Sequence, residues 1–281
     1  MRKHHSINIT TEPISLKNMI ASYSNGALND LEPGGYCDFG FPNGHAAWEC
    51  SKPAATLTRV SISKLDLRSS KLDEVIRSFA KVFDGIEIDT AQLLKACRAH
   101  LELMKSGGAA LCIVAKDLES NLRKAEVLFK KSPKECKTLA SLLELERESD
   151  IHNGSVLRDP SAAMGLLWIR RSLAFQSHLY ESLIHSDGQH PKDAACEGYN
   201  KHLFSYHGWM LRKVFPASFS AMPHRAVFLS KFGEVEIEEL DNEQESKVVR
   251  KLRALIGTLE PLLGAWKDSF EKLDLEDTRR V

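Results

Sequence analysis

Apolar residues recur every three to four positions from about residue 71 almost to the end of the chain. This spacing places them on one face of an α-helix. The stretches are separated by turn-forming residues, as at Ser106-Gly107-Gly108 and Asp159-Pro160, which commonly end helices. Runs of β-branched residues are few. The pattern predicts an all-α fold with helices at residues 71–83, 90–105, 109–131, 134–149, 160–184, 192–214, 224–231 and 243–272.

The first part of the chain has a different pattern. Residues 24–55 are rich in Gly, Pro, Asn and Ser and show no apolar period, and residues 59–67 alternate only partly, as a weak strand or linker would. Such segments form loops or stay irregular. We therefore expect two parts: an N-terminal extension over residues 1–70, mostly irregular or disordered, and a helical domain over residues 71–275.

Charge and composition exclude several classes of protein. The 281 residues carry 38 basic and 38 acidic side chains, so the formal net charge is zero. A dedicated nucleic-acid binder depends on neutralising phosphates, so no nucleic-acid partner is expected. No apolar run approaches the roughly 20 residues that a spanning helix needs, and the first residues lack the apolar core of a secretion signal. We expect a soluble, cytoplasmic protein.

Features of an enzyme or a metal site are missing from the sequence. The six cysteines are scattered without a CxxC pair, so they are expected to be reduced thiols rather than zinc ligands or disulfides. The sequence contains no GxSxG, P-loop, HExxH or GxGxxG motif, and we expect neither catalysis nor a cofactor. His178, His185, Asp187 and His190 surround a loop, but their spacing fits no standard metal signature, and a solvated loop is expected.

The predicted helix at residues 109–131 carries a polar stripe. Asp117, Asn121 and Lys124 are spaced i, i+4, i+7, so they share one narrow face at the border of the apolar arc. A carboxylate accepts hydrogen bonds, an ammonium donates them and an amide does both, so the stripe suits a ligand with several hydroxyl groups. The alternative is an ordinary surface stripe with a weak Asp–Lys interaction, which is common on helices.

Two aromatic segments add further candidates. Trp168 lies on an apolar helical face, flanked by Arg171, where it can stack on a sugar ring or simply belong to the core. His207 is surrounded by apolar residues, where a histidine is usually part of the core. Gly208 permits the close approach of a neighbouring segment, and Trp209 points away from His207, as an exposed interfacial aromatic would.

The ordered combination of these segments resembles the glycolipid transfer protein superfamily. The family's D-x3-N-x2-K motif is matched by Asp117-Leu-Glu-Ser-Asn121-Leu-Arg-Lys124. Its Trp-bearing helix resembles Leu166-Leu-Trp168-Ile-Arg-Arg-Ser-Leu, and its Y-H-G-W segment resembles Tyr206-His207-Gly-Trp209. The resemblance covers roughly residues 72–270. It implies a two-layer helical sandwich that holds the hydrocarbon chains of a lipid inside and its headgroup at a surface site.

The resemblance also implies a role for each matching residue. The protein would carry a sphingolipid, with a glycosylated ceramide favoured, between membranes that it contacts peripherally and transiently. The residues that would bind the headgroup are Asp117, Asn121, Lys124, Trp168, His207 and Arg171. Trp209 would dock at the membrane. The sequence does not identify a protein partner for the N-terminal extension.

Two alternatives remain open at this point. One is a carrier of a phosphosphingolipid of the ceramide-1-phosphate type, for which Lys124 and Arg171 offer cations, although an indole at position 168 offers none. The other is a sensor that binds lipid without shuttling it. Pro216 and Pro261 depart from the family pattern. Pro216 is expected to kink or end its helix, and Pro261 lies inside the last apolar stretch.

Overall fold

The structure is a computed structural model, which describes residues 70–108, 111–185 and 189–281. The chain divides into two compact units, Met1–Ser51 and Lys52–Val281, and every described residue belongs to the second. The predicted extension and the weak strand at 59–67 therefore lie outside the described residues, apart from Ser70. Ser70 caps the first described helix, with its hydroxyl accepting from the Asp73 amide and the Asp73 carboxylate accepting from the Ser70 amide.

The described residues are helical, as predicted. Between the helices they form only isolated bridges and no strand. The helices are α2 (Lys71–Phe79), α3 (Thr90–Ser106), α4 (Cys112–Lys131), α5 (Leu139–Glu148), α6 (Ala162–Ile184), α7 (Pro191–His202), α8 (Leu211–Phe219), α9 (Arg225–Gly233) and α10 (Asn242–Lys272), with short 3-10 turns η3 (Phe204–Tyr206) and η4 (Ile237–Glu239).

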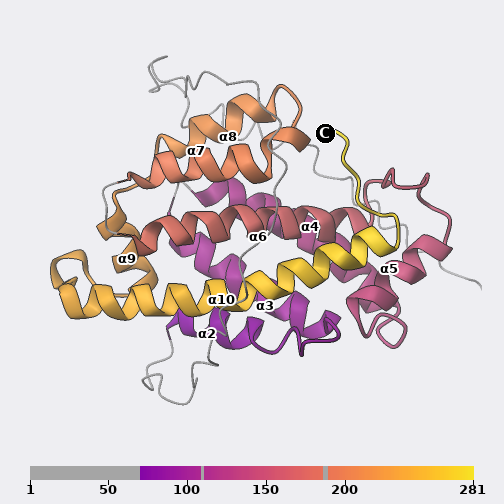
Figure 1. The fold of residues 1–281 in the computed structure, drawn as a ribbon, viewed down its shortest axis with the longest axis horizontal. Coiled ribbons are helices and arrows are strands. Elements are labelled where there is room, and N and C mark those ends of the chain that lie inside the picture. Colours follow the sequence, from indigo (N-terminus) through magenta and orange to yellow (C-terminus); the bar gives the residue numbers. More distant parts are fainter. Residues whose placement is uncertain (1–69, 109–110, 186–188) are drawn as a thin grey trace, which may run out of the picture. The chain divides into compact units, whose positions relative to one another are not determined.

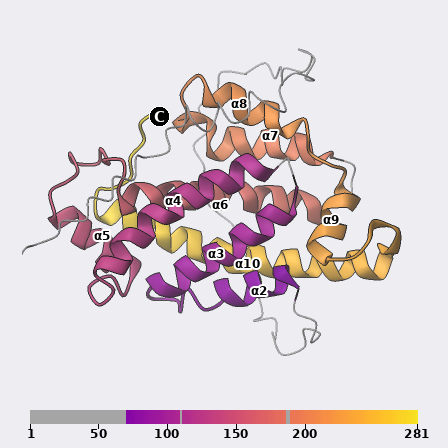
Figure 2. The same cartoon turned by 180° about the vertical axis from the view of Figure 1, so that it is seen from behind.

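The helices pack in two layers, which confirms the predicted helical sandwich. Helices α6, α7 and α10 lie toward the viewer in Figure 1, and α3 and α4 lie toward the viewer from behind in Figure 2. Helix α6 is the centre of the packing because it contacts α4, α7 and α10. Most of its residues are buried, which fits a helix that is apolar around most of its circumference.

The predicted helix at residues 192–214 is wrong, because the chain leaves the helical path between α7 and α8. His207 has extended backbone angles (φ −88°, ψ 137°). The Gly208 N–H donates to the Val281 carbonyl (2.6 Å), and the Val281 N–H donates to the Tyr206 carbonyl (2.9 Å). These bonds to a distant segment replace helical ones. A Cβ at position 208 would lie 2.9 Å from the Val281 oxygen, so the expected close approach at this glycine is confirmed.

The two unexpected prolines have different outcomes. Helix α8 contains Pro216 and ends three residues later, at Phe219. Helix α10 contains Pro261 and continues from Asn242 to Lys272, in agreement with the predicted helix at 243–272. A helical proline removes one amide donor, which at position 261 leaves only the Gly257 carbonyl without its donor. None of the helices in the described part of the chain combines the length and apolar character needed for a membrane span.

Candidate functional site

The polar stripe of α4 is held in place by contacts on both sides. Val114, Leu118 and Leu122 turn inward and are almost fully buried, which fixes the rotation of the helix. Asn121 is buried as well. The Lys124 ammonium donates to Asn121 Oδ1 (3.1 Å) and pairs with Asp159 Oδ1 across the loop before α6 (2.7 Å). The amide and the ammonium of the stripe therefore lie together.

Asp117 is electrostatically unusual. Its side chain is half-buried, and burial raises the pKa of its carboxyl from 3.8 to about 6, while the charge of Lys124 and a hydrogen bond from Asn121 act in the opposite direction. Removal from water favours the neutral form of a carboxyl group. Asp117 is therefore mostly ionised at pH 7 and mostly protonated at pH 5. Titratable groups with shifted pKa values cluster at functional sites.

Gly165 joins this stripe to α6. A Cβ at this position would lie closer to the Asn121 carbonyl oxygen than real Cβ atoms come to any neighbour, and it would lie 3.0 Å from Lys124 Cβ. Only a glycine therefore lets the two helices approach this closely. Gly165 lies three residues before Trp168 on the same helix, so the close contact brings the α4 stripe within one turn of the indole.

Trp168 and His207 form the second part of the site. Their rings stack with centroids 5.2 Å apart and planes inclined by 23°, and both residues are more than nine-tenths buried. The hydroxyl of Tyr199 lies 3.0 Å from His207 Nδ1, so Nδ1 is engaged within the protein. Burial, helped by Arg212 and Arg171, lowers the pKa of His207 to about 4, so the imidazole is neutral at pH 7.

Arg171 lies beside the indole, and one of its terminal nitrogens, Nη2, is engaged by the segment after α10. Its Cζ is 5.4 Å from the Trp168 ring centroid and 3.5 Å from that of Tyr206. Its Nη2 donates to the carboxylate of Glu276 (3.0 Å) and to the carbonyl of Asp277 (2.5 Å). Arg171 thus fastens the segment after α10 next to the stacked rings.

A buried polar network braces the same helix one turn further on. Gln176 Nε2 donates to Ser172 Oγ (2.9 Å), and Gln176 Oε1 lies 2.6 Å from His100 Nε2 on α3. The Tyr180 hydroxyl lies 3.2 Å from the same nitrogen. All four side chains are buried, so they link α3 to α6 and are unavailable to a ligand at the surface.

Trp209 stands apart from these residues. It is 71% exposed, and the Lys213 ammonium lies 5.5 Å from the centroid of its ring. An exposed indole next to a cation is typical of side chains that settle at a membrane interface. Within the described residues no cluster of three His, Cys, Asp or Glu side chains could hold a metal ion; Asp187 of the histidine-rich loop lies outside them.

The structure thus brings the sequence candidates together in two groups. Asp117, Asn121 and Lys124 form one, and Trp168, His207 and Arg171 form the other, with Trp209 outside both. Sequence reasoning missed the residues that hold these groups, namely Gly165, Asp159, Tyr199, Tyr206 and Glu276. A glycine inside an apolar helix was the one available signal, and it pointed to Gly165.

Comparisons with known proteins agree with this arrangement. The family model described as "Glycolipid transfer protein (GLTP)" matches residues 88–234. Glycolipid transfer protein 1 of Arabidopsis thaliana is 31% identical over 147 residues, which cover 52% of this chain and 70% of that protein. The glycolipid transfer protein of Danio rerio is 33% identical over 141 residues, 47% of this chain and 66% of that protein.

Solved structures show the same fold. The apo form of mouse ceramide-1-phosphate transfer protein aligns with a TM-score of 0.65 at 20% identity, covering 75% of this chain and all (100%) of that one. A fungal glycolipid transfer protein aligns with a TM-score of 0.62 at 24% identity, covering 74% and 100%. The family match spans more than half of the sequence and includes α4, α6 and the His207 segment. The chain belongs to the glycolipid transfer protein family.

Proposed function

We propose that this protein binds a sphingolipid, most favourably a glycosylated ceramide, and carries it between membranes. The observation that carries the proposal is the stacked pair of Trp168 and His207, set within one turn of the polar stripe of α4. Support comes from the family match and from the two relatives above, both named glycolipid transfer proteins. Carriage makes and breaks no covalent bond, so the protein acts as a carrier rather than an enzyme.

Each residue of the site has a physical task in this proposal. Ionised Asp117 accepts hydrogen bonds from lipid hydroxyl or amide groups, Asn121 donates and accepts, and Lys124 donates. The neutral His207 adds a ring nitrogen, and the indole of Trp168 faces the first sugar. A headgroup that leaves one of these groups without a hydrogen-bond partner loses about 1–3 kcal/mol of binding free energy, and this penalty gives the site its selectivity.

The state of the cations favours a sugar over a phosphate. A phosphate monoester needs charge-assisted donors, and Trp168 supplies no charge. Lys124, the cation of the α4 stripe, is already paired with Asp159 (2.7 Å). A phosphate at the stripe would have to displace this carboxylate and compete with it. The ceramide-1-phosphate alternative is therefore the less favourable one.

The hydrocarbon chains require a different part of the molecule. Exposing a chain to water costs about 0.8 kcal/mol per CH₂ group, so a carrier must hold the chains in an apolar interior. Between α6 and α8 the rings of Phe175 and Phe219 stack with centroids 5.7 Å apart, and both are fully buried. We propose that such aromatic layers part to admit the chains, and that Trp209 inserts into the cytoplasmic face of the membrane during the exchange.

Vesicle-to-vesicle transfer of glucosylceramide tests the site. Asp117→Val and Trp168→Ala are each expected to abolish transfer while the helical circular dichroism remains. Glu119→Gln is the matched control for the lost charge, because Glu119 lies two positions along α4 and faces Arg123 in an ion pair (3.1 Å). Retained transfer by both site variants would refute the assignment.

Two further measurements separate the alternatives. Mass spectrometry of lipid that co-purifies with the protein identifies the headgroup, and competition between glucosylceramide and ceramide-1-phosphate ranks the two. Binding without transfer between vesicles would select the sensor. We also propose that residues 71–275 contain the lipid-binding domain. Deletion of residues 1–69 should leave carriage intact, and a truncated protein that folds but moves no lipid would contradict this.

A further inference from the structure

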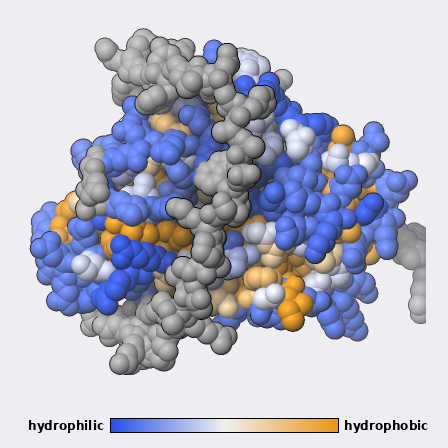
Figure 3. All heavy atoms as spheres, viewed as in Figure 1, coloured by the Kyte–Doolittle hydropathy of each residue, from blue (hydrophilic) through white to orange (hydrophobic). Residues whose placement is uncertain are grey.

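A surface groove is lined by residues on and next to α6, α7 and α10, three helices that lie side by side toward the viewer in Figure 1. Its volume is about 330 Å³. The part of this face that is visible in Figure 3 is mostly hydrophilic, with several hydrophobic patches. The groove is lined by Arg170, Arg171, Ala174, Lys201, His202, Tyr206, Leu263, Gly264, Lys267 and Glu276. Four of these side chains are cations and one is a carboxylate, so the lining carries a net charge of three positive units (4 − 1 = 3).

Two arginines form the base of the groove. Arg170 and Arg171 are 8% and 5% exposed, and they share one carboxylate, that of Glu276 (2.6 and 3.0 Å). One negative charge therefore faces two positive charges. In addition, Nε of each arginine is buried without a hydrogen-bond partner in the described residues. Buried polar groups are normally paired, so these unpaired donors indicate a place for an acceptor.

Two lysines stand on the opposite walls. Lys201, on α7, is exposed and has no ion-pair partner in the part of the chain that the structure describes. Lys267, on α10, pairs with Glu271 one turn away (3.1 Å), and both side chains are about half exposed. Such an exposed i,i+4 pair contributes little, so Lys267 can turn to another anion. Burial lowers the pKa of His202 to about 4, so His202 adds no charge at pH 7.

We propose that this groove binds a phosphate group, at a site that shares Arg171 with the headgroup candidates but lies apart from the polar stripe of α4. Lysines act as point charges on phosphate oxygens, and arginines add planar donors. The groove lies on the α7–α10 side of α6, and the Asp117–Lys124 stripe lies on α4. The inference thus goes beyond the proposed function and does not depend on it. The phosphate can belong to a phospholipid headgroup in the membrane or to a soluble molecule.

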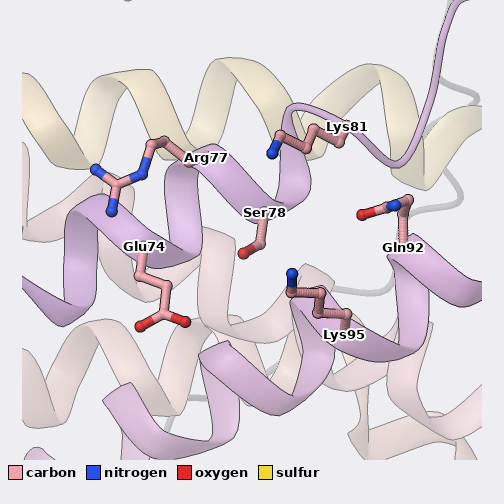
Figure 4. A pocket seen from close by; sticks show the side chains of 6 residues that line it. All are labelled: Glu74, Arg77, Ser78, Lys81, Gln92 and Lys95. Atoms are coloured by element: carbon pink, nitrogen blue, oxygen red, sulfur yellow. The ribbon is translucent and has the colours of Figure 1, made fainter.

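A second groove offers a comparison. It has a volume of about 240 Å³ and lies between α2 and α3, lined by Glu74, Arg77, Ser78, Lys81, Gln92 and Lys95. Figure 4 shows Lys95 extending toward Ser78, with Lys81 on the other side of the serine. Its two lysines are exposed, and no arginine in its lining is fully buried. It therefore lacks the feature that points to an anion in the first groove, and its lysines serve as a matched control.

The experiment measures binding of the full chain to phosphatidylcholine vesicles with and without phosphatidic acid, in the absence of any sphingolipid. The double variant Lys201→Ala/Lys267→Ala should weaken binding to the anionic vesicles about twenty-five-fold, since each lysine near a phosphate surface contributes about fivefold. The control Lys81→Ala/Lys95→Ala loses the same charge but should change binding less than about twofold, because its lysines lie outside the groove and the attraction falls off within a Debye length.

A second variant keeps the lysines and fills the groove instead. A Cβ at Gly264 would meet no atom within 4 Å, so Gly264→Glu adds a carboxylate without a backbone clash. It should weaken binding as strongly as the lysine pair. Thermal unfolding of each variant shows whether the fold is intact. Because the vesicles contain no sphingolipid, failure here leaves the carrier proposal untouched, and failure of the carrier proposal leaves this one untouched.

Titration with inorganic phosphate distinguishes the two sources. Binding to anionic vesicles that the groove variants lose and that inorganic phosphate does not displace would identify a phospholipid headgroup. Binding of inorganic phosphate that the groove variants lose, with vesicle binding unchanged, would identify a soluble ligand. Either result supports the site. Wild-type binding of both probes by the groove variants, or an equal loss in the Lys81/Lys95 control, would overturn it.

Discussion

The close contact at Gly165 gives the sharpest test of how the site is held together. Gly165→Ala places a methyl group against the Asn121 carbonyl and 3.0 Å from Lys124 Cβ. The Asn121 carbonyl belongs to the backbone and cannot rotate away as a side chain can, so α4 and α6 must move apart. Because α4 carries the polar stripe and α6 carries Trp168, the separation moves the two groups of the site apart.

The magnitude follows from two opposing terms. Replacing glycine by alanine inside a helix gains about 1 kcal/mol of intrinsic helix stability, whereas forcing an extra methyl group into a packed contact costs about 1–3 kcal/mol. Gly257→Ala on α10 is the matched control, because a Cβ there meets nothing within 4 Å and receives only the gain. The free energies of unfolding of the two variants should therefore differ by about 1–3 kcal/mol.

Urea unfolding and glucosylceramide transfer are measured on both variants. Gly257→Ala should be more stable than the wild type and transfer lipid normally. The free energy of unfolding of Gly165→Ala should be about 1–3 kcal/mol lower than that of the control. Its transfer rate should fall by more than this loss of stability explains, since a displacement of about 1 Å can cost a hundredfold in a process that depends on geometry. Equal stability of the two variants, with normal transfer by both, would refute the idea that this glycine sets the geometry of the site.

The remaining predictions concern single groups. The transfer rate should decline from pH 7 to pH 5, because Asp117 has a pKa of about 6 and loses acceptor capacity on protonation. The Asp117→Asn variant should transfer lipid more slowly, at a rate that does not change over the same pH range. Tyr199→Phe removes the 3.0 Å bond to His207 and should lower the free energy of unfolding by about 0.5–1.5 kcal/mol together with lipid affinity, and unchanged affinity would argue against a role for the imidazole. Trp209→Ala should leave stability within about 0.5 kcal/mol because the indole is 71% exposed, yet slow transfer to acceptor vesicles. Burial lowers the pKa of His100 from 6.5 to about 4. Between these two pH values the imidazole is therefore protonated in the unfolded chain but not in the folded protein. Stability should therefore fall as the pH drops through this range, by on the order of 3 kcal/mol, and denaturant unfolding of His100→Gln should show a smaller pH dependence.

The sequence by itself determined the features that depend on neighbouring residues. The apolar period predicted a helix at 90–105, and α3 spans Thr90–Ser106. It predicted 243–272, and α10 spans Asn242–Lys272. The spacing i, i+4, i+7 put Asp117, Asn121 and Lys124 on one face, because a helix fixes such relations within two turns. The order of the motifs was enough to indicate the family.

Only the tertiary structure decided the features that depend on distant segments. The break between α7 and α8 follows from backbone hydrogen bonds of Tyr206 and Gly208 to Val281, which no local pattern can contain. Arg171 has its carboxylate partner 105 residues away at Glu276, and the stack of Trp168 on His207 joins two separate elements. Hydrogen bonds, charges and ring contacts act over a few ångströms in space whatever the separation along the chain, so these partners are fixed by folding and are absent from the sequence pattern.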